Sequence, residues 1–73
     1  MKRLTESEKR MLRSCYAYGC TGINGNQYVD PIADRVGLKT VLAYFEELAE
    51  NYTVSYNVAT DSEGVTYNSL IKN

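Results

Sequence analysis

Histidine and tryptophan are absent from this sequence, and cysteine and proline are scarce, with two residues and one. The lack of histidine removes the commonest general base and every Ser/His or Cys/His nucleophile pair. Neighbouring Glu46 and Glu47 point about 100° apart on a helix, so they form no facing carboxylate pair. So short a chain also has little material to enclose a ligand pocket of the usual roughly few hundred Å³. We therefore predict no catalytic residue and no cofactor, and a protein that is not an enzyme.

The two cysteines, Cys15 and Cys20, do not suffice for a four-ligand zinc site when histidine is missing. We expect two reduced, half-buried thiols near a helix end, because free cysteine packs as a small hydrophobic residue. Two alternatives stay open. One is a disulfide between them, which cytosolic redox conditions disfavour, and the other is a thiol-based metal or redox site shared across a dimer. Within one chain, no metal site is predicted.

Long hydrophobic runs are also missing. No segment approaches the ~20 apolar residues that span a bilayer, and the first residues lack the hydrophobic core of a signal peptide. We expect a cytoplasmic protein without a membrane partner. A chain of 73 residues holds one core, so residues 1–73 are predicted to form a single domain. A chain this short buries only about 60% of its unfolded surface, so a homodimer is one way to gain stability.

Capping residues and apolar spacing predict a first helix. Thr5 and Glu8 form a capping box, and Gly19 ends the helix by allowing a left-handed cap. The solvent side carries Lys9, Arg10 and Arg13. The predicted inward stripe consists of Met11, Leu12, Cys15 and Tyr18.

A second helix is predicted after a glycine-rich loop at residues 19–26 and a short extended piece at residues 27–29. Asp30 is the expected N-cap, Pro31 takes the first helical position, and Gly37 closes the helix. Its apolar face is expected to hold Ile32, Ala33 and Val36, with Asp30, Asp34 and Arg35 facing outward.

The third helix is predicted to follow a Leu38-Lys39 turn, with Thr40 as its N-cap and Asn51 near its end. Its outward face carries Glu46, Glu47 and Glu50. The expected inward stripe is Val41, Leu42, Phe45, Leu48 and Ala49.

From Tyr52 the apolar period changes from helical to two, which predicts a half-buried strand with Tyr52, Val54, Tyr56 and Val58 on its inner face. Residues 60–64 are the expected hairpin loop, and residues 65–71 the return strand. Of the seven tyrosines, we expect Tyr16, Tyr28, Tyr52 and Tyr56 at the core or its edge, and Tyr44 and Tyr67 exposed.

The order of three helices and a C-terminal β-hairpin, an α+β fold, resembles the winged helix-turn-helix family. Residues 31–48 carry the resemblance, with a helix, a Gly37-Leu38 turn, Thr40-Val41 and Leu48 near the helix end; the extended residues 52–58 follow as a wing. In that family the helix after the turn enters the DNA major groove and the hairpin touches the DNA backbone or minor groove. The resemblance would place Lys39, Thr40, Ala43, Tyr44 and Glu47 in the groove, with Asp61 and Glu63 at the wing tip.

The charges oppose that use. Residues 1–15 carry five basic and two acidic side chains, whereas residues 28–73 carry three basic and seven acidic ones. An acidic groove-facing helix repels phosphates, so we favour a small non-catalytic regulator that binds a protein partner. The predicted partner-binding residues are Lys39, Thr40, Tyr44, Glu47 and Glu50, and a secondary basic patch is formed by Lys9, Arg10 and Arg13.

A component of transcription, replication or defence machinery would fit this prediction, and in size and composition the chain resembles accessory proteins of phages and mobile elements. The alternative is a DNA-binding transcriptional regulator, expected to be dimeric. In that alternative Lys39, Thr40 and Tyr44 read bases and the basic first helix adds phosphate contacts.

Overall fold

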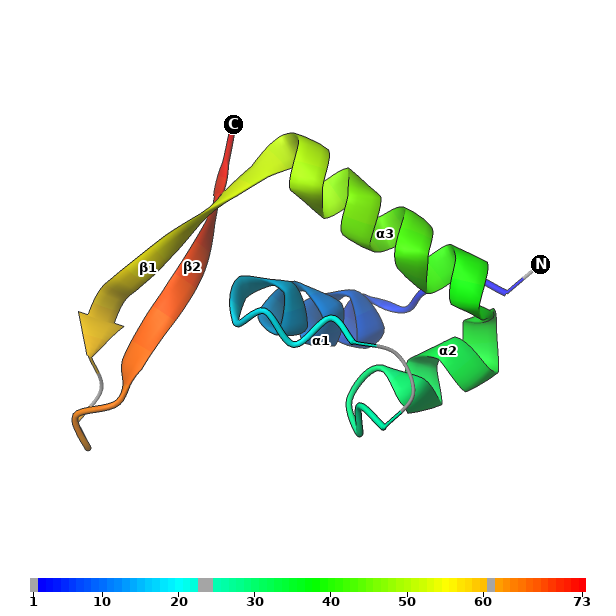
Figure 1. Cartoon of the computed structure of the whole chain (residues 1–73), viewed down its shortest axis with the longest axis horizontal. Helices are drawn as coiled ribbons and strands as arrows, with labels where there is room; N and C mark the ends of the chain where they lie inside the picture. Colours follow the sequence, from blue (N-terminus) through cyan, green and yellow to red (C-terminus); the bar gives the residue numbers. More distant parts are fainter. Residues whose placement is uncertain (1, 23–24, 61) are drawn as a thin grey trace.

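A computed structural model describes residues 2–22, 25–60 and 62–73. Figure 1 shows three helices followed by a two-stranded antiparallel hairpin, which confirms the predicted α+β class. Positions 23, 24 and 61, and with them the predicted wing-tip charge of Asp61, lie outside the described residues. The elements are α1 (Glu6–Ala17), α2 (Asp30–Val36), α3 (Leu38–Asn51), β1 (Tyr52–Thr60) and β2 (Thr66–Lys72).

Local chemistry fixes both ends of α1 as predicted. The Thr5 hydroxyl accepts from the Glu8 amide at 3.1 Å, and the Thr5 amide donates to Glu8 Oε1 at 2.9 Å. At the other end Gly19 adopts a left-handed φ of 75°. The Cys20 amide then reaches back to the Cys15 carbonyl at 2.8 Å, which completes a Schellman cap.

The hydrophobic core lies between the three helices. Four side chains are almost fully buried, namely Leu12, Val29, Val41 and Leu48, and they are joined by Cys15, Ile32 and Phe45. Met11, Tyr18 and Leu42, predicted to face inward, are instead 41%, 49% and 39% exposed, and Ala49 is exposed too. The reason is geometric: each helix packs only a narrow stripe against its neighbours, and these residues lie on its flank.

The segment before α2 corrects the prediction of an extended piece, because residues 27–29 form a turn. The Asn26 side chain accepts hydrogen bonds from the amides of Tyr28 and Val29 at 3.0 and 3.2 Å, and these local hydrogen bonds stabilise the turn. Val29 takes the N-cap position predicted for Asp30, whose carboxylate instead accepts from the Gly25 amide at 2.8 Å. Tyr28 is 49% exposed, not at the core edge.

A single residue, Gly37, separates α2 from α3. Its φ of 94° breaks the helical path within one position, so the predicted Leu38-Lys39 turn is absent and α3 begins at Leu38. No side chain caps this start, so Thr40 is a residue of the first turn and not an N-cap. The end of α3 matches the prediction, because the Asn51 side chain donates to the Glu47 carbonyl at 2.8 Å.

An ion pair fastens α2 to the start of α1. Arg35 Nε donates to Glu8 Oε2 at 2.7 Å, and a second guanidinium nitrogen donates to the other carboxylate oxygen. The same nitrogen donates to the Arg3 carbonyl at 2.6 Å. The hydrogen bonds from Arg35, followed by the one from the Thr5 amide, lower the pKa of Glu8 to about 2. Arg35 is thus on the surface, as predicted, and its guanidinium group is hydrogen-bonded to Glu8 and to the Arg3 carbonyl.

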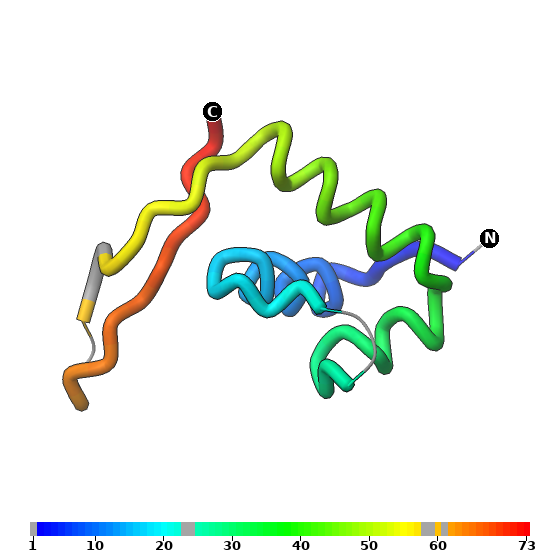
Figure 2. The backbone as a smooth tube through the Cα atoms, viewed as in Figure 1, coloured from blue at the N-terminus to red at the C-terminus, as the bar shows by residue number. Residues whose placement is uncertain are grey.

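The hairpin leaves the end of α3 and stands beside the C-terminal end of α1 (Figures 1 and 2). Tyr52 pairs with Lys72 and Val54 with Leu70, and the register shifts between Ser55 and Ala59. At this irregularity Asn57 has a φ of 54° and Tyr56 is 70% exposed, which corrects its predicted place at the core edge. The side chains at positions 58 and 59, including the predicted inward Val58, lie outside the description.

One asparagine attaches the hairpin to α1. Asn68 Nδ2 donates to the Ala17 carbonyl at 2.9 Å, and the Asn68 amide donates to Tyr18 Oη at 3.2 Å. Leu70 and Tyr52 pack against the core from the same side of the ribbon. The hairpin therefore has one face on the helices, and its remaining surface exposes Tyr67 at 41%, as predicted, and Ile71 at 55%.

Candidate binding surface

The exposed side of α3 divides into three parallel strips, because successive residues turn by about 100° around a helix. Lys39, Glu46 and Glu50 fall within about 40° of one another, directly opposite the buried stripe. All are exposed, as is Ala43 beside them. We call these four residues the outer strip. It is about 16 Å long from Lys39 to Glu50 and carries one positive and two negative charges.

The strip on one side of it turns toward α1. It contains Thr40, Tyr44 and Glu47, of which the first two are half-buried and Glu47 is exposed. Tyr44 Oη accepts a hydrogen bond from Arg13 at 2.9 Å. Tyr44 is therefore a link between α3 and α1, and not the freely exposed side chain that the sequence predicted.

The strip on the other side is apolar. It contains Leu38 and Leu42, which are 42% and 39% exposed, and the exposed Ala49. We call these three residues the apolar flank. Sequence reasoning missed it, because it assigned Leu42 and Ala49 to the core and Leu38 to a turn. A projection at 100° per residue places Leu38 and Ala49 beside Phe45 in one apolar arc, so only the packing of the neighbouring helices decides which part of the arc is buried.

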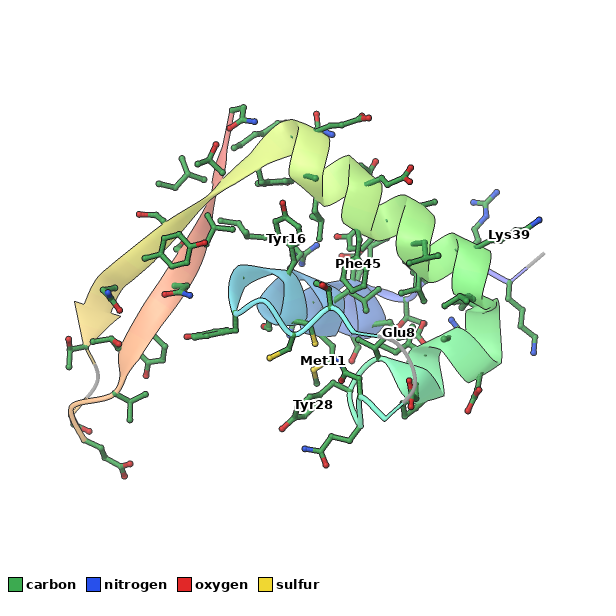
Figure 3. All side chains as sticks on the ribbon, viewed as in Figure 1. Glu8, Met11, Tyr16, Tyr28, Lys39 and Phe45 are labelled. Carbon is green, nitrogen blue, oxygen red and sulfur yellow. The ribbon has the colours of Figure 1, made fainter. Side chains whose placement is uncertain are left out.

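The predicted partner-binding residues therefore divide between two strips, with Lys39 and Glu50 on the outer strip and Thr40, Tyr44 and Glu47 on the strip that turns toward α1. Lys39 lies at the α2 end of α3, as Figure 3 shows, and Glu50 lies near the other end. Tyr44 and Glu47 instead line a shallow hollow of about 370 Å³ between α1, α3 and the hairpin. We call it the basic hollow because Lys9, Arg13 and Lys72 outnumber Glu6 and Glu47 in its lining.

The predicted basic patch is split between two neighbouring hollows. Lys9 lies 3.8 Å from Glu6 and lines the basic hollow. Arg10 lines a second hollow of about 370 Å³ together with Arg13, Asn68 and Ser69, and within the described part of the chain its lining holds no acidic residue. Lys72 was missing from the predicted patch, because only the strand register brings it next to Tyr52 and α1.

The thiols differ in environment. Cys15 is buried and Cys20 exposed, and both are free, so the disulfide alternative is not realised in this structure. Burial, helped by the nearby Cys20, raises the pKa of the Cys15 thiol. Among residues 2–22, 25–60 and 62–73, no cluster of three or more His, Cys, Asp or Glu side chains is arranged to hold a metal ion.

No family model, no curated protein and no solved structure matches this chain. Within the part of the chain that is described, no helix is long and apolar enough to cross a membrane.

Proposed function

We propose that this chain is a small, non-catalytic regulator of the winged-helix type that binds a protein partner through α3. The contact surface is the outer strip together with the apolar flank. The observation that carries the proposal is the pairing of these two strips on one helix: Glu46 and Glu50 are exposed beside Leu42, which is 39% exposed.

The electrostatics of the outer strip disfavour a phosphate groove as its partner. DNA affinity comes largely from lysine and arginine side chains that neutralise phosphates. On α3 only Lys39 offers such a charge, whereas Glu46, Glu47 and Glu50 are all exposed. Glu63 adds a further exposed negative charge on the hairpin loop. A basic protein surface complements this pattern.

The apolar flank favours the same conclusion. Apolar side chains at the centre of a protein interface are desolvated on binding, while charged side chains at its rim select the partner. Leu38, Leu42 and Ala49 supply the first kind, and Glu46 and Glu50 the second. The expected partner therefore presents an apolar groove bordered by lysine or arginine. Such a partner fits a component of transcription, replication or defence machinery.

Capture from nuclease-treated native extract tests this proposal. The immobilised chain is expected to retain a protein partner after nucleic acid is removed, and Glu46→Lys is expected to weaken retention at least about tenfold. Glu63→Lys makes the same charge change on the exposed hairpin loop and serves as the matched control. Leu42→Ser is expected to reduce capture as strongly as Glu46→Lys.

Retention that Glu46→Lys and Leu42→Ser leave unchanged contradicts the proposal. So does the recovery of nucleic acid alone from extract that has not been treated with nuclease.

A DNA-binding transcriptional regulator is the second candidate, and a specific observation favours it. Arg10, Arg13 and Lys72 collect around the two hollows between α1 and the hairpin. In that candidate these side chains hold phosphates while Lys39 enters the groove. It predicts salt-sensitive duplex binding at about 50 mM salt that weakens in Lys39→Gln and in Arg10→Gln.

A further inference from the structure

Every sulfur atom of the described residues lies around one hollow on the side of α1 that faces away from α3. The hollow has a volume of about 320 Å³ and is lined by Met11, Ser14, Cys15, Tyr18, Cys20 and Tyr28. Figure 3 shows the sulfur atoms grouped beneath α1, with Met11 and Tyr28 labelled there and Phe45 on the opposite side of the helix. Among the residues that the structure describes, those that line this hollow are all uncharged.

Helix geometry and the helix cap bring the three sulfurs together. Met11 and Cys15 are four residues apart and therefore share a face of α1. The Schellman cap then folds the chain back, with the Cys20 amide 2.8 Å from the Cys15 carbonyl oxygen. Standard bond lengths added to that 2.8 Å contact place the Cα atoms of Cys15 and Cys20 at most about 7 Å apart.

The sulfur atoms have few competing interactions. The Cys20 thiol makes one weak contact, donating to the Tyr18 carbonyl at 3.8 Å. Cys15 faces the hollow from the buried side, whereas Cys20 and Met11 are exposed, so an ion has access from solvent. The described residues that line the hollow include two thiols and a thioether, and none of them carries a carboxylate.

We propose that Met11, Cys15 and Cys20 form a binding site for Cu(I). Thiolate and thioether are the ligands that select this soft ion, and Cu(I) accepts the low coordination number that three sulfurs provide. Zinc and magnesium are poor candidates, because zinc sites take four ligands and magnesium takes oxygen ligands. On binding, Cu(I) replaces the thiol protons of Cys15 and Cys20, which pass to solvent. Met11 contributes a lone pair, and no electron is transferred.

The test is an anaerobic titration of the purified, reduced chain with Cu(I) in competition with a coloured Cu(I) chelator. The expected result is that each chain keeps one equivalent of Cu(I) from binding to the chelator. Loss of a group that only supports a metal ligand costs about ten- to a hundredfold in affinity. Loss of a thiolate ligand in Cys20→Ser should therefore cost at least about a hundredfold. Met11→Leu keeps the apolar volume but removes the thioether ligand, so it should cost at least about tenfold.

Controls separate ligand loss from unfolding. Cys20 is exposed, so Cys20→Ser is expected to keep the circular dichroism spectrum and the melting temperature of the wild type. Ser14→Ala changes the same hollow without removing a sulfur and should bind Cu(I) as the wild type does. The proposal is overturned if the wild type withholds no Cu(I), if Cys20→Ser binds as tightly as the wild type, or if one Cu(I) is shared by two chains.

Discussion

The two faces of α3 differ more than any other pair of neighbouring surfaces in the molecule. The inner face holds Val41, Phe45 and Leu48, none more than 8% exposed, whereas every residue of the outer strip is exposed. The inner face explains why the chain folds, since it packs against α1 and α2. The outer strip and the apolar flank contribute little to that packing, and under the proposed function they are the surface that contacts the partner.

The sharpest test of this contrast compares two leucines of α3. Leu48 is 1% exposed and Leu42 is 39% exposed. Leu48→Ala should lower the free energy of unfolding by about 2–5 kcal/mol, because it leaves a cavity in the core. Leu42→Ala should lower it by less than about 1 kcal/mol. Urea denaturation of both variants measures the difference, and equal losses would show that Leu42 belongs to the core after all.

The junction between α2 and α3 comes next in expected effect. Gly37 has a φ of 94°, and an added Cβ there meets no atom within 4 Å. Gly37→Ala should therefore destabilise the fold by about 1–3 kcal/mol through backbone strain alone. Gly22→Ala is the matched control, because its Cβ is equally unobstructed and no positive φ strains it. Similar melting temperatures for the two variants would contradict this account of the junction.

A smaller effect is expected where α3 meets α1. Tyr44→Phe removes the acceptor of the hydrogen bond from Arg13, which should cost about 0.5–1.5 kcal/mol. A double-mutant cycle with Arg13→Gln isolates the pair. If the two losses add without coupling, Tyr44 is not the link between the helices that its 2.9 Å contact indicates.

The Glu8–Arg35 ion pair predicts a pH dependence of stability. The pKa of Glu8 is lowered from 4.5 to about 2, so the native state favours the charged carboxylate. The stabilisation is present above pH 4.5 and is lost as the pH falls toward 2. Melting temperatures across this range should fall less in Glu8→Gln than in the wild type. Melting temperatures that fall equally in Glu8→Gln and in the wild type would contradict a stabilising ion pair between Glu8 and Arg35.

Sequence reasoning succeeded where the determining chemistry is local. The capping box of Thr5 and Glu8, the left-handed Gly19 and the change of period at Tyr52 all depend on residues a few positions apart. Each of these predictions is confirmed.

The predictions failed where a contact between distant positions decides the outcome, or where two local motifs compete. Tyr56 is exposed because the strand register shifts beside it, and Lys72 joins the basic hollow only through its pairing with Tyr52. Asp30 is not the N-cap of its helix, because the Asn26 side chain accepts from the amides of Tyr28 and Val29 and closes a turn just before Asp30. The apolar flank was missed because an apolar residue on a helix was assumed to be buried.

Duplex DNA titration tests most directly the claim that the charges of the outer strip of α3 oppose a phosphate groove. Wild type and Glu46→Gln/Glu50→Gln are titrated against a labelled random duplex at about 50 mM salt, with fluorescence anisotropy as the readout. The account predicts no saturable binding by the wild type, and an increase in affinity when the two repelling carboxylates are neutralised. Tight, salt-sensitive binding by the wild type that neutralising Glu46 and Glu50 leaves unchanged would contradict it.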